Sequence, residues 1–142
     1  MARPGHYRYL NARCNHETPG LFIAQGQNMK IALLREPLKA RELTDWGAPP
    51  DLIDGASHTQ GTLLHKGESG QSECGYWECT PGHWPCRVER DEFCHFLEGE
   101  ARYENEDGQI TQIRADTIAF FPAGWSGTCR VTKTLKKVYT IR

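Results

Sequence analysis

The stretch Asp91-Glu92-Phe93-Cys94-His95-Phe96-Leu97-Glu98-Gly99 has the pattern of a half-buried strand that runs into a glycine turn. Side chains alternate between the two faces of a strand. One face therefore carries Glu92, Cys94 and Phe96, and the other Phe93, His95 and Leu97. A carboxylate is unusual beside a thiol and a phenyl ring. Because a buried carboxylate needs a hydrogen-bond donor, a cation or a metal, or else stays protonated, the partner of Glu92 is the central question.

Glu92 is the candidate catalytic residue, since a raised pKa in the interior would suit a general acid or base. The competing interpretation is structural, an ion pair with Arg87 or Arg102. Cys94 shares the Glu92 face, but a nucleophilic thiol needs a histidine or a cation beside it, and His95 points the other way. Cys94 is therefore interpreted as core filling. His95 is expected to pack under a second sheet or at a subunit contact, with a partner for its ring nitrogen.

The length and charge of the chain limit the number of domains it can form and the kinds of partner it can bind. A chain of 142 residues can form one well-buried core and is short for two domains. Its net charge of −1 favours neither nucleic acid nor an anionic membrane surface as a partner. No apolar run is long enough to span a bilayer, and the first residues lack the apolar stretch of a secretory signal. We expect a cytoplasmic protein.

The six cysteines do not indicate a disulfide framework. They form no Cys-x-x-Cys pair, and a chain of this size does not need covalent cross-links. Small buried hydrophobes, or a few reactive thiols in a reducing compartment, are the expected roles.

The first 28 residues are polar and have no regular pattern of apolar residues, and the pattern of residues changes at Met29. We divide the chain into an N-terminal extension or arm, residues 1–28, and a single domain, residues 29–142. One interpretation is that Met29 is the natural start. The other is an arm that pairs with a neighbouring subunit, anchored by Leu21-Phe22-Ile23-Ala24.

The rest of the chain predicts short strands separated by glycine and proline turns. Trp46 is expected to cap the core from a loop, and Asp51–Asp54 to make one helical turn. An Asp-Gly pair at 107–108 predicts a hairpin. The expected strands are 61–65, 73–79, 86–89, 92–97, 100–104, 109–113, 117–121, 128–132 and 136–141. This spacing favours an all-β sandwich or barrel.

Four motifs, in this order, resemble the cupin superfamily. They are Trp46-Gly47-Ala48-Pro49-Pro50, Gly75-Tyr76-Trp77-Glu78-Cys79-Thr80-Pro81-Gly82, the 91–99 stretch, and Asp116-Thr117-Ile118-Ala119-Phe120-Phe121-Pro122-Ala123-Gly124-Trp125. More narrowly, they are similar to the subfamily named after the ethanolamine-utilisation cupin and (S)-ureidoglycine aminohydrolase. The resemblance covers roughly residues 40 to 141. It implies an all-β cupin jelly roll, that is, a double-stranded β-helix barrel, and a homodimer.

The resemblance also implies a degenerate metal site. Metal-binding cupins place three histidines and a glutamate at one end of the barrel. Glu92 falls on the glutamate position, whereas the histidine positions fall near Cys86, near Val88 and on Gly127. A substitute set for zinc, or for manganese or iron, is Cys79, His83, Cys86 and Glu92. Its spacing matches no common zinc signature, and the alternative is a loop thiol and a surface imidazole.

A group of mostly aromatic residues is the candidate lining of a pocket mouth, although aromatic residues in a small barrel are more often core. With Cys94 the predicted pocket comprises Tyr76, Glu78, Tyr103, Phe121 and Trp125.

Three functions remain open. The first is a cupin that binds a small metabolite at a polar pocket centred on Glu92 and has an accessory or low-activity role in amine or carboxylate metabolism. The second is a metal-dependent hydrolase or isomerase of a small nitrogenous metabolite, as the ureidoglycine resemblance implies. The third is a structural partner subunit without a ligand. The fold alone does not choose among them.

Overall fold

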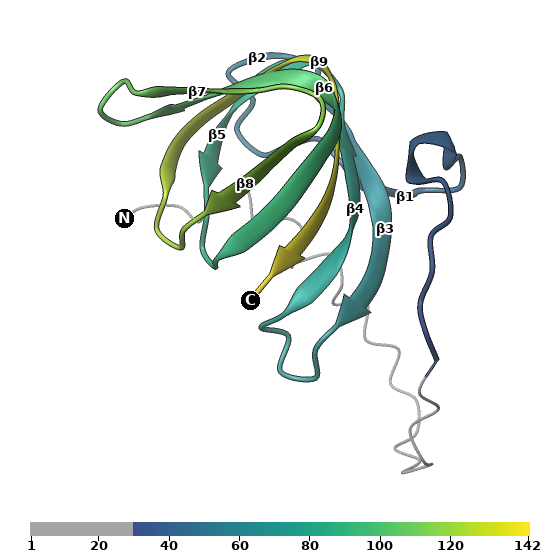
Figure 1. The fold of residues 1–142 in the computed structure, drawn as a ribbon. Coiled ribbons are helices and arrows are strands. Elements are labelled where there is room, and N and C mark those ends of the chain that lie inside the picture. Colours follow the sequence, from purple (N-terminus) through teal and green to yellow (C-terminus); the bar gives the residue numbers. More distant parts are fainter. Residues whose placement is uncertain (1–29) are drawn as a thin grey trace.

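The computed structural model describes residues 30–142, which form strands and one short 3₁₀ helix, η1 (Figure 1). The 1–28 extension and its Leu21–Ala24 anchor lie outside the described residues. The elements are η1 Pro37–Lys39, β1 Thr44–Gly47, β2 Asp54–Gly55, β3 Thr59–Lys66, β4 Glu73–Cys79, β5 Gly82–Arg87, β6 Glu92–Asn105, β7 Ile110–Ile113, β8 Thr117–Phe121 and β9 Ser126–Ile141. The prediction of an all-β fold is confirmed, and the predicted strands 73–79 and 117–121 match β4 and β8 to the residue.

Strands β6 and β9 are the two long strands on which the barrel is built. They pair with each other, and all strand pairs are antiparallel. One path of neighbours runs β1-β3-β4-β9-β5-β2, while β6 also pairs with β7 and β8. Figure 1 shows the strands curling round a common interior, with the β6–β7 hairpin projecting at one end and the C-terminus at the other. No helix within residues 30–142 is long and apolar enough to cross a membrane.

The predicted glycine turn after Leu97 is wrong, because β6 continues through Gly99 to Asn105. The register between β6 and β9 shifts three times between Phe96 and Ala101, which bends the strand instead of ending it. Gly99 has φ +98°, and a Cβ there would lie 2.2 Å from the Thr134 carbonyl oxygen. Only glycine fits this bend. The expected strands 128–132 and 136–141 are likewise one strand, β9.

The side chains at the start of β6 alternate between the interior and the outer face, as predicted. Glu92, Cys94 and Phe96 are fully buried, whereas Phe93 on the opposite face is half exposed. The hairpin at Asp107-Gly108 joins β6 to β7, and Gly108 has φ +78°. The sequence predicts these local patterns because the side-chain period of a strand depends only on the strand itself.

Three smaller expectations are corrected. Asp51–Asp54 makes no helical turn, and Asp54 instead begins the short strand β2. Trp46 reaches the core from strand β1 rather than from a loop. The extended piece expected from Cys86 begins earlier, at Gly82, and includes Pro85, so that β5 pairs with β9 along its length.

Candidate functional site

The partner of Glu92 is Lys137. Glu92 begins β6 and lies opposite Ile141 of β9, and Lys137 lies four residues before Ile141 on the same inward face. The Lys137 ammonium donates a hydrogen bond to Glu92 Oε1, and both residues are buried, at 0% and 2% exposure. The predicted structural alternative, an ion pair with Arg87 or Arg102, is wrong. Arg102 pairs with Glu104 at 2.8 Å instead, and Arg87 is exposed at the end of β5.

Lys137 is the functional residue that the sequence reasoning missed. Its alternation with Leu135, Tyr139 and Ile141 was a usable signal, because all four residues share one face of β9. Lys136 points outward and lies 3.3 Å from Glu98.

The surroundings of Lys137 keep it charged. Burial lowers the pKa of the ammonium, but the charge of the Glu92 carboxylate and its hydrogen bond outweigh this, so the pKa lies above the usual lysine value. Three rings add cation–π attraction: Nζ lies 4.7 Å from the centroid of Trp77, 5.7 Å from that of Phe96 and 5.9 Å from that of Tyr139. The interior therefore holds a fixed positive charge beside Glu92.

The second oxygen of Glu92 is unsatisfied. Oε2 is buried and has no hydrogen-bond partner within residues 30–142. A buried carboxylate oxygen without a donor costs about 1–3 kcal/mol or more, so it calls for an explanation.

Glu73 is a second buried carboxylate at the same end of the barrel, and the sequence reasoning missed it too. It begins β4 and, like Glu92, lies opposite Ile141 of β9. Its Oε1 accepts a hydrogen bond from the Tyr139 hydroxyl at 3.4 Å, and Arg90 Nη2 lies 4.0 Å from Oε2. That separation is too long for a hydrogen bond. Burial raises the pKa of Glu73, with Arg90, Lys66 and the Tyr139 hydroxyl opposing it.

The inward thiols are inert. Cys94 is fully buried, its Sγ lies 3.8 Å from the Ala119 carbonyl oxygen, and burial raises its pKa to about 12. Burial likewise raises the pKa of Cys79 to about 11. Because the thiolate is the nucleophile and the metal ligand, these pKa values favour the core-filling interpretation. His95 points outward and places Nε2 2.8 Å from Asp116, which supplies the expected partner.

The four substitute metal ligands are not brought together. Cys79 and Cys86 are buried, but His83 lies on the opposite face of β5 from Cys86, where its Nδ1 is 2.9 Å from Arg130 Nη2 and 3.5 Å from Asp54. Glu92 is already bound to Lys137. Within residues 30–142, no group of three or more His, Cys, Asp and Glu side chains is arranged to hold a metal. The donor set does not fit the metal that the family resemblance implies.

The predicted pocket residues divide between two faces. Tyr103, Phe121 and Trp125 form an aromatic cluster inside, with centroid separations of 4.9 and 5.9 Å from Tyr103. Tyr76 and Glu78 lie on the outer face of β4, where the Tyr76 hydroxyl donates to Glu78 Oε1 at 2.6 Å. The outer pair and the inner cluster therefore cannot line one mouth.

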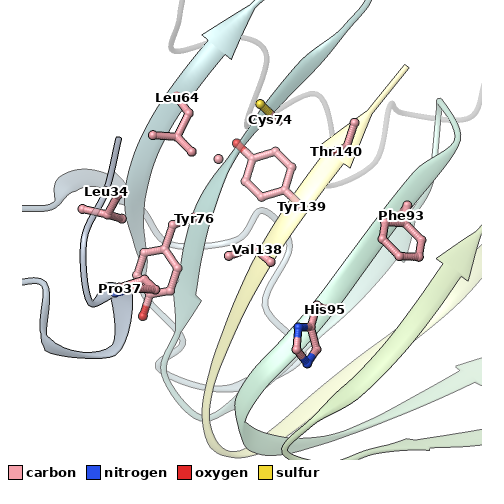
Figure 2. A pocket seen from close by; sticks show the side chains of 11 residues that line it. Leu34, Pro37, Leu64, Cys74, Tyr76, Phe93, His95, Val138, Tyr139 and Thr140 are labelled. Carbon is pink, nitrogen blue, oxygen red and sulfur yellow. The ribbon is translucent and has the colours of Figure 1, made fainter. Parts of the chain in front are cut away.

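A groove of about 290 Å³ that the sequence patterns do not predict lies on the outer face (Figure 2). Leu34 and Pro37, from the segment before β1, form one wall. The floor comes from β4, β6 and β9, and the labelled side chains there include Cys74, Tyr76, Phe93, His95 and Val138.

The apolar face beside this groove extends across β9, β6 and β8. Phe93 lies opposite Phe120, and His95 lies between Ile118 and Val138 in the strand register. Phe93, Phe120 and Ile118 are 52%, 61% and 67% exposed. Adjacent large hydrophobic side chains of this exposure are typical of an interaction surface.

Comparison with known proteins supports the fold. The sequence model of the EutQ-like cupin domain matches residues 66–139. A DUF861-family protein of unknown function from Pseudomonas syringae pv. tomato matches with a TM-score of 0.63 and 20% identity, over 70% of this chain and 44% of that chain. A putative ethanolamine utilization protein Q from Salmonella typhimurium matches with a TM-score of 0.53 and 21% identity, over 67% of this chain and 76% of that chain. The EutQ protein of Clostridium difficile matches with a TM-score of 0.53 and 18% identity, over 64% of this chain and 75% of that chain.

These likenesses confirm the predicted jelly-roll barrel. At such identities they establish the fold alone. The chain spans less than half the length of the Pseudomonas protein that it matches. No curated protein that was compared matches the sequence.

Proposed function

Because this chain belongs to the family of EutQ-like cupin domains, we propose that it binds a small metabolite in the barrel, at the ion pair of Glu92 and Lys137. The role is accessory or of low activity, in amine or carboxylate metabolism. The site is a degenerate metal site in which a lysine ammonium supplies the positive charge that a metal ion supplies elsewhere.

The observation that carries this proposal is the state of the Glu92 carboxylate. A fully buried carboxylate with one oxygen on an ammonium and the other without a partner among the described residues is a costly arrangement for structure alone. A bound ligand that donates a hydrogen bond would satisfy the second oxygen. A few precisely placed polar groups in an otherwise apolar interior are typical of ligand sites.

The similar Salmonella structure supports the choice of metabolite class. That protein is a putative ethanolamine utilization protein Q, and ethanolamine is a small amine.

A thermal-shift panel of small amines and carboxylic acids tests the proposal. A ligand at about a hundred times its Kd should stabilise the protein by about 2.7 kcal/mol, which raises the melting temperature by several degrees. Binding should weaken in Glu92→Gln and persist in Glu106→Gln, a matched change on the exposed hairpin tip. If no compound in the panel stabilises the protein, the binding function is wrong and the structural-subunit interpretation gains support.

Elemental analysis of protein purified without a histidine tag tests the absence of a metal role. We expect less than stoichiometric zinc, manganese or iron. A stoichiometric metal that is lost in Glu92→Gln would overturn the proposal and favour the hydrolase or isomerase interpretation.

We also propose that the protein is a homodimer that pairs through the apolar face of β6, β8 and β9. Support comes from the exposure of Phe93, Ile118 and Phe120 on adjacent strands. Burial of such a face stabilises association at about 25 cal/mol per Å² of apolar area, before the entropic costs of association.

A further inference from the structure

Glu73 and Glu92 flank the same residue of β9. Each is opposite Ile141, Glu73 from β4 on one side and Glu92 from β6 on the other, and all three belong to the inward face. The charge of Glu92 contributes to the raised pKa of Glu73, so the two carboxylates interact through space. They lie at the end of the barrel where β9 ends and β4 and β6 begin (Figure 1).

Each of these two carboxylates has one oxygen that accepts a hydrogen bond and one that does not. Glu92 Oε1 accepts from Lys137, and Glu73 Oε1 accepts from the Tyr139 hydroxyl. Oε2 of both residues is buried without a hydrogen-bond partner within residues 30–142. Two buried acceptors without a hydrogen-bond donor at one end of the barrel define the complementary ligand as a donor of at least two hydrogen bonds.

We infer that the ligand of this site is a small primary ammonium compound whose N–H groups donate to Glu73 and Glu92; this rests on the proposed binding function and adds Glu73 to the site. A primary ammonium carries three donors and a positive charge, and hydrogen bonds between ions are roughly twice as strong as neutral ones.

The cations already present do not fill this role. Lys137 is bound to Glu92 Oε1 and lies against the Trp77 ring. Arg90 directs Nη1 to the carbonyl oxygens of Gly70 and Gln71 at the β3–β4 connection. Its Nη2 lies 4.0 Å from Glu73 Oε2, an ion-pair separation that is too long for a hydrogen bond. A carboxylate ligand in the same place would face two like charges and would leave both open oxygens unsatisfied.

A ligand series on the wild-type protein tests the inference without a mutation. Calorimetry would compare n-propylamine, propionate and propyltrimethylammonium. We expect propylamine to bind at least about tenfold more tightly than either of the others, because propionate carries the wrong charge and the quaternary cation has no N–H to donate. Equal affinity for propionate would overturn the amine class. Equal affinity for the quaternary ammonium would overturn hydrogen bonding at the open oxygens.

Variants then test the part assigned to Glu73. Propylamine should bind at least about tenfold more weakly to Glu73→Gln than to the wild-type protein. Its affinity for Glu106→Gln should equal that for the wild-type protein. Undiminished binding to Glu73→Gln would remove Glu73 from the site. If acids or neutral compounds bind in a Glu92-dependent way and propylamine does not, this inference fails while the proposed binding function stands.

Discussion

Lys137 and Glu92 form an ion pair inside the barrel although 45 residues separate them in the chain. The pairing of β9 with β6 brings both side chains to the inward face of the barrel. The long lysine side chain then reaches the carboxylate across the strand positions that separate the two residues. The pair is an electrostatic unit, because removal of either charge leaves the other buried without compensation.

Lys137→Met should lower the free energy of unfolding by about 3–5 kcal/mol, since Glu92 would remain as an isolated buried charge. The double variant Glu92→Leu/Lys137→Met should recover most of this loss, because it removes both charges and replaces them with apolar groups. Urea denaturation of the single and double variants would measure both effects and their coupling.

The matched surface control is Lys133→Met. Lys133 lies 2.8 Å from Glu100 in an exposed pair, so this change should cost far less stability than Lys137→Met. Equal losses for Lys133→Met and Lys137→Met would show that burial does not set the energetics of the Glu92 pair.

Glu73→Gln should change the dependence of stability on pH. The pKa of Glu73 in the folded protein is raised by burial above its ordinary value of 4.5, so the folded state holds the proton more tightly than the unfolded chain. The contribution of Glu73 is therefore fully present below pH 4.5 and is lost as the pH rises through the folded-state pKa. Relative to wild type, Glu73→Gln should gain stability across this window and then level off.

Glu100→Gln provides a control of opposite sign. Lys133 lowers the pKa of Glu100, so wild type should gain stability relative to Glu100→Gln as the pH rises from the lowered pKa to 4.5. Thermal unfolding at a series of pH values measures both profiles. Parallel profiles for the two variants would contradict the environments described for Glu73 and Glu100.

Alkylation should distinguish the cysteines. Cys79 and Cys94 are buried and have pKa values of about 11 and about 12, so few of their thiols are ionised near neutral pH. Cys74 is partly exposed in the outer groove. Peptide mass spectrometry after brief iodoacetamide treatment of the native protein should find Cys74 modified well before Cys79 and Cys94. Early modification of Cys94 would indicate an open, reactive interior.

Phe120→Asp should dissociate the proposed homodimer. A buried charge at the centre of an apolar interface is expected to weaken association at least about tenfold. Sedimentation velocity across a range of protein concentrations would detect the change. Ile110→Asp is the matched control, because Ile110 is also half exposed but lies on the β6–β7 hairpin. A monomeric wild-type protein, or an unchanged Phe120→Asp dimer, would reject this interface.

Local sequence patterns determined much of the fold. Alternation between Glu92 and Phe96 correctly predicted which side chains point inward, and the bounds of β4 and β8 followed from the composition and the turns beside them. The same alternation applied to Leu135–Ile141 would have placed Lys137 inside. These properties depend on a few neighbouring residues, so the sequence shows them directly.

The tertiary structure alone decided the composition of the site. Which cation meets Glu92 depends on the register between β6 and β9, and the position of Glu73 beside Glu92 depends on both strands pairing with β9 at Ile141. His83 and Cys86 are only three residues apart, yet because β5 begins at Gly82 and contains both, strand alternation puts them on opposite faces. Strand period is a local property, whereas strand pairing joins distant segments through backbone hydrogen bonds that carry no residue-specific signal in one sequence.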